Sequence, residues 1–136
     1  MTTVVFACVH NAGRSQIAAA LFNLYADPSK ARAISAGTRP AERVHPEVVD
    51  VMRSRGIDLS QARPQKLSEA LVADANWLIT MGCGDECPVV PGRQRDDWPL
   101  LDPKGQSAET VKAIASDIDQ RVRELVKAHA WEKNGA

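Results

Sequence analysis

The sequence lacks an excess of charge of either sign, because 17 lysine and arginine residues are balanced by 17 aspartate and glutamate residues. A chain without net charge has no general attraction for nucleic acid or for an acidic membrane surface, although a local anion site is still possible. The sequence also lacks any apolar run close to the roughly 20 residues that a membrane-spanning helix needs. Its first residues, MTTVVFACVHN, include no basic segment of the kind that opens a secretion signal. We therefore expect a cytoplasmic protein that binds neither nucleic acid nor membranes.

Cysteine is scarce, with three residues in a chain of 136. So small and odd a number does not suit the disulfide framework of a secreted protein. Thiols in the cytoplasm are usually reduced, and disulfides that form there tend to be transient and catalytic. Cys8 follows the first apolar segment, and Cys83 and Cys87 occur together much later, in MGCGDECP. If the three thiols share a chemistry, we expect it to depend on their reactivity.

The length and the 44% apolar content suit one domain, residues 1–136, around one core. Short apolar segments alternate with segments of helical periodicity: strands are predicted at residues 4–7, 33–36 and 76–81, and helices at 15–25, 46–55, 64–73 and 108–129. Residues 89–104 are rich in Pro, Gly and Asp, and we predict a long loop there with an edge strand near Trp98. This order predicts an α/β fold with a parallel sheet covered by helices, in which ligands bind beyond the carboxyl ends of the strands.

The segment between Cys8 and Ser15 has the features of an oxyanion site. A strand that turns into a helix leaves unpaired backbone N–H groups at the helix N-terminus, and such a turn binds a tetrahedral oxyanion. Asn11 and Gly13 tolerate the left-handed backbone that this turn requires, and Arg14 adds a planar fork of donors. The same surroundings favour a thiolate at Cys8, to which Ser15 could donate a hydrogen bond. A buried, inert cysteine and a solvated arginine are the alternative, but the spacing favours the site.

The residues C-V-H-N-A-G-R-S at positions 8–15 resemble the signature of the low-molecular-weight protein tyrosine phosphatase superfamily. The resemblance extends to ISAGT at 34–38, to NWLITMGCGDECP at 76–88 and to Asp102-Pro103, and it is strongest toward the arsenate reductase branch. It implies a three-layer sandwich with a central four-stranded parallel sheet. It also implies that Cys8 is the nucleophile and Asp102 the general acid. The oxyanion-binding residues that it implies are Val9, His10, Asn11, Ala12, Gly13, Arg14 and Ser15.

The loop alone does not choose between phosphate and arsenate, because both are tetrahedral oxyanions. A phosphatase needs one cysteine, an acid and a water, whereas reduction of arsenate to arsenite takes two electrons, which the formation of one disulfide supplies. We therefore predict an arsenate reductase in which Cys8 attacks arsenic and Cys83 then attacks Cys8, so that arsenite leaves. Cys87 next attacks Cys83, and thioredoxin reduces the resulting disulfide.

Three other hypotheses stay open. The protein could be a low-molecular-weight phosphatase with regulatory thiols, a reductase recycled by mycothiol or glutathione with a redoxin, or a non-enzymatic protein that binds arsenic or a metal through its cysteines. Lys104 and Gly105 stand where phosphotyrosine phosphatases carry tyrosines, which argues against a phosphotyrosine substrate. Ala19 stands where some thioredoxin-coupled relatives carry a carboxylate that helps to hold potassium. We expect no bound metal and no bound cofactor, with thioredoxin or a low-molecular-weight thiol as the electron donor.

A few further residues were candidates for the site. Asp96 and Asp97 could replace Asp102 as the acid, but neither precedes a proline. His45 is expected at the start of a helix and His129 on the exposed side of the last helix, each without an assigned partner. The C-terminal tail, which includes Trp131, is expected to be poorly ordered.

Overall fold

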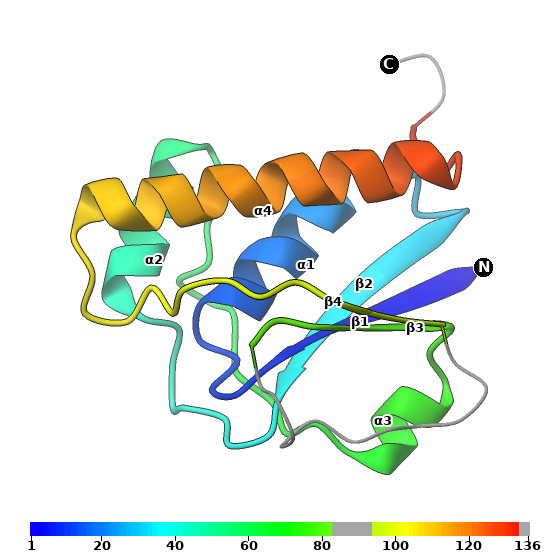
Figure 1. Cartoon of the computed structure of the whole chain (residues 1–136), viewed down its shortest axis with the longest axis horizontal. Helices are drawn as coiled ribbons and strands as arrows, with labels where there is room; N and C mark the ends of the chain where they lie inside the picture. The colour runs from blue at the N-terminus through cyan, green and yellow to red at the C-terminus, as the bar shows by residue number, and fades with distance from the viewer. Residues whose placement is uncertain (83–93, 134–136) are drawn as a thin grey trace.

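A parallel sheet of four strands in the order β2-β1-β3-β4 lies at the centre of the fold. The computed structural model describes residues 1–82 and 94–133 (Figure 1). The strands are β1 (Thr2–Cys8), β2 (Ala31–Gly37), β3 (Trp77–Thr80) and β4 (Gln94–Asp97). All four run in the same direction, so their carboxyl ends meet at one edge, where Cys8 pairs with Gly37 and Thr80 pairs with Asp97. The predicted four-stranded parallel sheet is confirmed.

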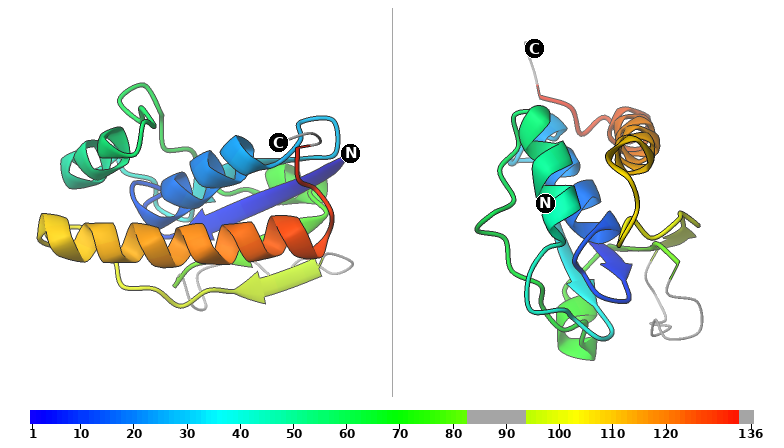
Figure 2. Two further views of the ribbon diagram at one scale, coloured as in Figure 1. Left: turned by 90° about the horizontal axis from the view of Figure 1, so that it is seen from above. Right: turned by 90° about the vertical axis from the view of Figure 1, so that its left-hand side faces the viewer.

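Helices cover both faces of this sheet, which gives the three predicted layers (Figures 1 and 2). They are α1 (Arg14–Tyr25), α2 (Pro46–Ser54), α3 (Glu69–Ala73) and α4 (Ala108–Ala128). Alternate side chains of β1 point to opposite faces. Val4, Phe6 and Cys8 join the large core beneath α1, α2 and α4, whereas Val5 and Ala7 join a smaller core on the side of α3. Cys8 therefore points toward the face that carries α1, the helix that begins six residues later.

The longest helix, α4, has one apolar face, as its periodicity predicts. It begins after Ser107, whose side chain accepts a hydrogen bond from the backbone N–H of Thr110 at 3.2 Å. Its apolar face consists of the buried residues Val111, Ile114, Ile118 and Val122 and the partly buried Leu125. No helix among residues 1–82 and 94–133 has the length and apolar character that crossing a membrane requires.

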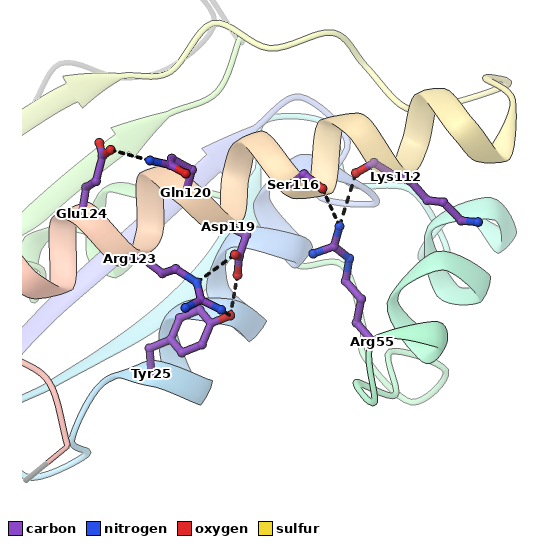
Figure 3. A network of polar contacts seen from close by, with 8 residues as sticks. All are labelled: Tyr25, Arg55, Lys112, Ser116, Asp119, Gln120, Arg123 and Glu124. Atoms are coloured by element: carbon purple, nitrogen blue, oxygen red, sulfur yellow. Dashed lines mark hydrogen bonds and ion pairs between the residues drawn. The ribbon is translucent and has the colours of Figure 1, made fainter. Parts of the chain in front are cut away.

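Polar contacts fasten α4 to its neighbours, as Figure 3 shows. The hydroxyl of Tyr25, at the end of α1, donates to Asp119 at 2.5 Å and accepts from Arg123 at 2.8 Å, and Arg123 also donates to Asp119 at 2.8 Å. Burial is the main cause that raises the pKa of Tyr25, and the hydrogen bond to Asp119 raises it further. At the other end, Arg55 donates to Ser116 at 2.7 Å. These contacts hold α4 against both α1 and α2.

Several predicted boundaries differ from the observed ones. Strands β1 and β2 are longer than predicted, because the two strands pair along their whole length, beyond the apolar residues at their centres. The helix predicted at 64–73 is reduced to α3, which begins after Ser68, whose side chain accepts a hydrogen bond from the N–H of Leu71 at 3.1 Å. The edge strand predicted near Trp98 is β4, whose four residues are all exposed.

The expectation that the tail around Trp131 is poorly ordered was wrong. Trp131 is 9% exposed and its ring centroid lies 5.8 Å from that of Phe22 on α1. The ring of His129, to which the sequence analysis assigned no partner, stacks on Trp131 with a centroid distance of 4.5 Å and an interplanar angle of 18°. The backbone N–H of Asp27 donates to the carbonyl of Trp131 at 2.8 Å. These contacts tie the chain after α4 back to the end of α1.

Candidate functional site

The sulfur of Cys8 lies at the base of the loop of residues 9–13, which joins β1 to α1. The residue is 2% exposed, and its Sγ lies 2.8 Å from Oγ of Ser15, in the first turn of α1. Asn11 donates from Nδ2 to the same Oγ at 2.7 Å. Because this oxygen already accepts a hydrogen bond, its own O–H is available to donate to the sulfur, which stabilises a thiolate. The contact predicted between Ser15 and Cys8 is present.

The carbonyl groups of Cys8 and of the five residues of this loop all accept hydrogen bonds from neighbouring segments. Four of them accept from backbone N–H groups of the loop of residues 38–45, at 2.8 to 3.3 Å. Thr38 donates to Cys8, Arg39 to Val9, Ala41 to His10 and His45 to Ala12. The other two take donors from α1. The carbonyl of Asn11 accepts from Nε2 of Gln16 at 3.1 Å, and that of Gly13 accepts from the N–H of Ile17 at 3.0 Å. The 38–45 loop and α1 together therefore fix the orientation of every peptide group in the 9–13 loop.

The N–H groups of residues 10–15 have no hydrogen-bond partner in the part of the chain that the structure describes. Most of this stretch is buried, with Asn11, Ala12 and Ser15 all at 0% exposure. Buried backbone donors are nearly always paired, and a set of them at a helix N-terminus is an arrangement that binds an oxyanion.

The backbone conformation of this loop was predicted correctly at one residue and wrongly at another. Asn11 has the left-handed conformation expected of it, with φ of 49°. Its Oδ1 accepts from the N–H of Gln65 at 3.0 Å, which holds the side chain in place. Gly13, however, has φ of −144°, so it is not left-handed. Gly13 is needed for space instead, because a Cβ atom there would lie 2.6 Å from Cγ of Pro103.

Arg14 has a buried guanidinium with one donor group unused. Its side chain is 8% exposed, and Nη1 donates to the carbonyl of Leu100 at 3.0 Å. Nη2 lies 3.8 Å from Oδ2 of Asp102. Among the described residues, Nε of Arg14 is the buried side-chain nitrogen or oxygen that has no hydrogen-bond partner. The edge formed by Nε and Nη2 carries parallel N–H groups, which match two oxygens of one anion.

Asp102 is the carboxylate that reaches this arginine. Its side chain is 40% exposed, and Oδ1 accepts from the N–H of Lys104 at 3.0 Å. The alternatives are occupied elsewhere: Asp96 accepts from Nε1 of Trp98 at 3.1 Å, and Asp97 accepts from Oγ1 of Thr80 at 2.5 Å. A half-exposed carboxyl beside a buried anion site has access both to the bound anion and to water, as a proton donor requires.

The structure also brings to the site two residues to which the sequence analysis gave no role there. The ring of His45 lies next to the loop, with Cδ2 3.7 Å from where a Cβ of Gly13 would be. Burial lowers the pKa of His45, and the negative charges of Asp102 and Glu47 oppose that shift. Gln16, which donates to Asn11 and so supports the loop, was not singled out from the sequence. Neither residue belongs to a local pattern, because each is placed by the path of a loop or the rotation of a helix.

Cys83 and Cys87, the other two predicted catalytic residues, lie outside the described residues. The chain can be followed as far as Gly82, two residues beyond the end of β3. A Cβ atom at Gly82 would lie 2.5 Å from Nη1 of Arg14. The segment that leads from β3 to the two cysteines therefore passes the guanidinium two residues after the strand ends.

Comparison with known proteins gives the family. Residues 3–134 match the family described as low molecular weight phosphotyrosine protein phosphatase. The chain belongs to this family. The prediction that the 8–15 motif is the signature of this superfamily is confirmed, and so is the fold that the resemblance implies.

Within the family, the chain belongs to the arsenate reductase branch. A protein of Halobacterium salinarum assigned to the arsenate reductases is 39% identical, over 88% of this chain and 87% of the relative. The glutaredoxin arsenate reductase of a Synechocystis species is 32% identical, over 93% and 97%. The solved thioredoxin-dependent arsenate reductase of Corynebacterium glutamicum is 43% identical with a TM-score of 0.81, over 94% of this chain. The chain spans only 61% of that protein's length.

Proposed function

We propose that this protein reduces arsenate to arsenite in a reducing, cytoplasmic compartment, and that Cys8, Cys83 and Cys87 supply the thiols. The observation that carries the proposal is a set of N–H groups, those of residues 10–15, which surround the buried sulfur of Cys8 and have no partner among the described residues. This set, together with Nε of Arg14, provides donors for the oxygens of a tetrahedral anion bound above the sulfur. Membership of the arsenate reductase branch supports arsenate as that anion.

In the first step, the Cys8 thiolate attacks arsenic and forms a sulfur–arsenic bond. The oxygen that leaves arsenic takes a proton from Asp102 and departs as water. The position of Asp102, with Oδ2 3.8 Å from Nη2 of Arg14, supports this role, because the arginine would hold the anion next to the acid. Arsenic is still in its higher oxidation state at this point, and no electrons have been transferred to it.

The reduction takes place in the second step, when the Cys83 thiolate attacks the sulfur of Cys8. A sulfur–sulfur bond forms, the sulfur–arsenic bond breaks, and its electron pair stays on arsenic, which leaves as arsenite. Two thiols have then been oxidised to one disulfide, and this accounts for the two electrons. Cys87 next attacks Cys83 and releases Cys8, and a dithiol partner such as thioredoxin reduces the Cys83–Cys87 disulfide.

The proposal is tested by arsenate-dependent NADPH consumption in the presence of thioredoxin and thioredoxin reductase. The wild-type protein should turn over, and each of Cys8→Ser, Cys83→Ser and Cys87→Ser should lose the activity. Hydrolysis of p-nitrophenyl phosphate by the same variants is the internal control, since a phosphatase step requires Cys8 alone. If Cys87→Ser were fully active with thioredoxin, the transfer of the disulfide to Cys87 would be wrong. If the wild type consumed no NADPH with arsenate and any donor, the reductase proposal itself would fail.

A second electron donor has a specific reason to be tested. The Synechocystis relative is named as a glutaredoxin arsenate reductase, so glutathione with glutaredoxin, or mycothiol with its redoxin, could replace thioredoxin. The assay should therefore be run with each donor at matched concentrations. Activity with glutathione and glutaredoxin that is independent of Cys87 would favour that alternative. Phosphatase activity without arsenate reduction would instead favour a low-molecular-weight phosphatase.

A further inference from the structure

Gly82 lies against the Nη1 end of the Arg14 guanidinium. A Cβ atom built at Gly82 would be 2.5 Å from Nη1 of Arg14, 3.6 Å from its Cζ and 3.6 Å from the carbonyl oxygen of Leu100. An approach of 2.5 Å is too short for any pair of non-bonded heavy atoms of this kind. The buried guanidinium therefore occupies space that any residue other than glycine would fill with its own side chain.

This contact decides which donors of Arg14 are left for a ligand. With Gly82 in place, Nη1 reaches the carbonyl of Leu100 at 3.0 Å, and the group has a fixed orientation. Nη1 is then occupied, and the edge formed by Nε and Nη2 is the one that stays available. A rigid guanidinium loses less entropy when it binds a second group than a freely rotating one does.

We propose that Gly82 is a positioning residue for Arg14. Its missing side chain lets the guanidinium lie where Leu100 accepts from Nη1, and this orients the Nε edge for a tetrahedral oxyanion. Gly82 touches neither the ligand nor the sulfur, and its effect is exerted entirely through Arg14. The inference rests on the oxyanion site proposed above, and it adds that the end of β3 helps to define that site.

Gly82→Ala is an informative variant because the atom it displaces is the tip of a side chain. The fold can accommodate the new methyl group if the guanidinium moves away, and that movement breaks the bond to Leu100. Gly82 also has a positive φ of 89°, which an alanine adopts at some cost in stability. Gly56, with φ of 81° and no atom within 4 Å of a Cβ, has the same backbone requirement without the contact. Gly56→Ala is therefore the matched control.

The measurement is the affinity of the reduced protein for inorganic phosphate, by isothermal titration calorimetry, because phosphate has the shape of arsenate but accepts no electrons from thiols. We expect Gly82→Ala to bind phosphate about tenfold more weakly than the wild type, as the loss of one charge-assisted hydrogen bond would predict. Gly56→Ala should bind like the wild type. In an Arg14→Ala background, adding Gly82→Ala should change the affinity no further, because the residue through which it acts is gone.

The outcomes separate this inference from the proposed function. If the wild type binds no phosphate, or if Arg14→Ala binds as well as the wild type, the oxyanion site is wrong. If Arg14→Ala binds weakly but Gly82→Ala binds like Gly56→Ala, the site stands and the positioning role of Gly82 is overturned. Should Gly82→Ala fail to fold, Gly82→Asn places a Cβ at the same point in a residue that tolerates positive φ. It should show the same loss of affinity, and normal binding by it would overturn the proposal.

Discussion

The hydroxyl oxygen of Ser15 lies 2.8 Å from the sulfur of Cys8, and both residues are buried. The oxygen also accepts a hydrogen bond from Asn11 at 2.7 Å. Asn11 is itself held by the backbone of Gln65. The contact at the sulfur is thus the end of a chain of hydrogen bonds that fixes where the hydroxyl proton points.

Ser15→Ala should make Cys8 less reactive as a nucleophile. The variant removes the O–H that stabilises the thiolate, and a hydrogen bond to a charged group contributes about 1.5–3 kcal/mol. We expect alkylation of Cys8 by iodoacetamide to slow by roughly tenfold near neutral pH. The rate is measured in a background with Cys83→Ser and Cys87→Ser, so that one thiol reacts. Ser29→Ala, on the exposed turn after α1, is the control; equal rates for both variants would contradict the role of Ser15.

Asp102→Asn should slow turnover without weakening anion binding. An amide cannot protonate the leaving oxygen, and loss of a general acid typically costs about 10²–10⁴ in rate. The affinity for phosphate should stay the same or rise, because a negative charge 3.8 Å from Nη2 of Arg14 is removed. Asp96→Asn is the comparison, because Asp96 lies in β4 and its carboxylate accepts a hydrogen bond from Nε1 of Trp98. If Asp96→Asn turned over more slowly than Asp102→Asn, the assignment of Asp102 as the general acid would be wrong.

His45 should make the protein less stable as the pH falls below about 6.5. Burial lowers the pKa of His45 from its usual value of 6.5, partly opposed by the charges of Asp102 and Glu47. Below pH 6.5 the unfolded chain therefore binds a proton that the folded protein does not yet bind, so the free energy of unfolding decreases as the pH falls. Urea denaturation from pH 7.5 to 5 should show a steeper decrease for the wild type than for His45→Gln.

The same histidine offers a direct test of its neighbour. Asp102→Asn removes a negative charge that favours the protonated ring, so the pKa of His45 should fall further in that variant. An NMR titration of the His45 ring resonances in both proteins measures this shift. An unchanged pKa would mean that Asp102 and His45 do not interact across the site in solution.

Trp131→Ala should destabilise the protein by about 3 kcal/mol, the usual cost of truncating a buried aromatic side chain. The ring packs on Phe22 and His129, and its removal leaves a gap between the end of α4 and α1. Urea denaturation at neutral pH measures the change. Leu24→Ala, at a side chain that is 47% exposed, is the control and should cost much less. A loss as small as that of Leu24→Ala would mean that the tail is loosely attached.

The sequence predicted best where its signals were local. The spacing of Cys8, Arg14 and Ser15 placed them at a strand–helix boundary, and the structure has them there with the sulfur and the hydroxyl in contact. The parallel sheet followed in the same way from strands that alternate with helices. In both cases the physical cause acts within one turn or one element of the chain.

Contacts between distant segments could not be predicted in this way. Gly13 was expected to be left-handed, but it is glycine because Pro103 packs against it from 90 positions away. Trp131 was placed in a disordered tail because nothing near it in the sequence indicates that it meets Phe22. The backbone donors of the 38–45 loop could not be predicted either, since that loop has neither helical nor strand periodicity. Such contacts depend on how the elements pack.

The hydrogen bonds that the 38–45 loop donates to the carbonyls of residues 8–12 come from its main chain, and this has a consequence for substitutions. The donors at residues 39, 41 and 45 are peptide N–H groups, which every amino acid except proline provides. As far as these bonds are concerned, the side chains of Arg39 and Ala41 can be exchanged freely. A proline at either position would remove one donor and leave a carbonyl of the 9–13 loop unpaired. At positions 39 and 41 the hydrogen bonds that support the 9–13 loop are thus compatible with every amino acid except proline.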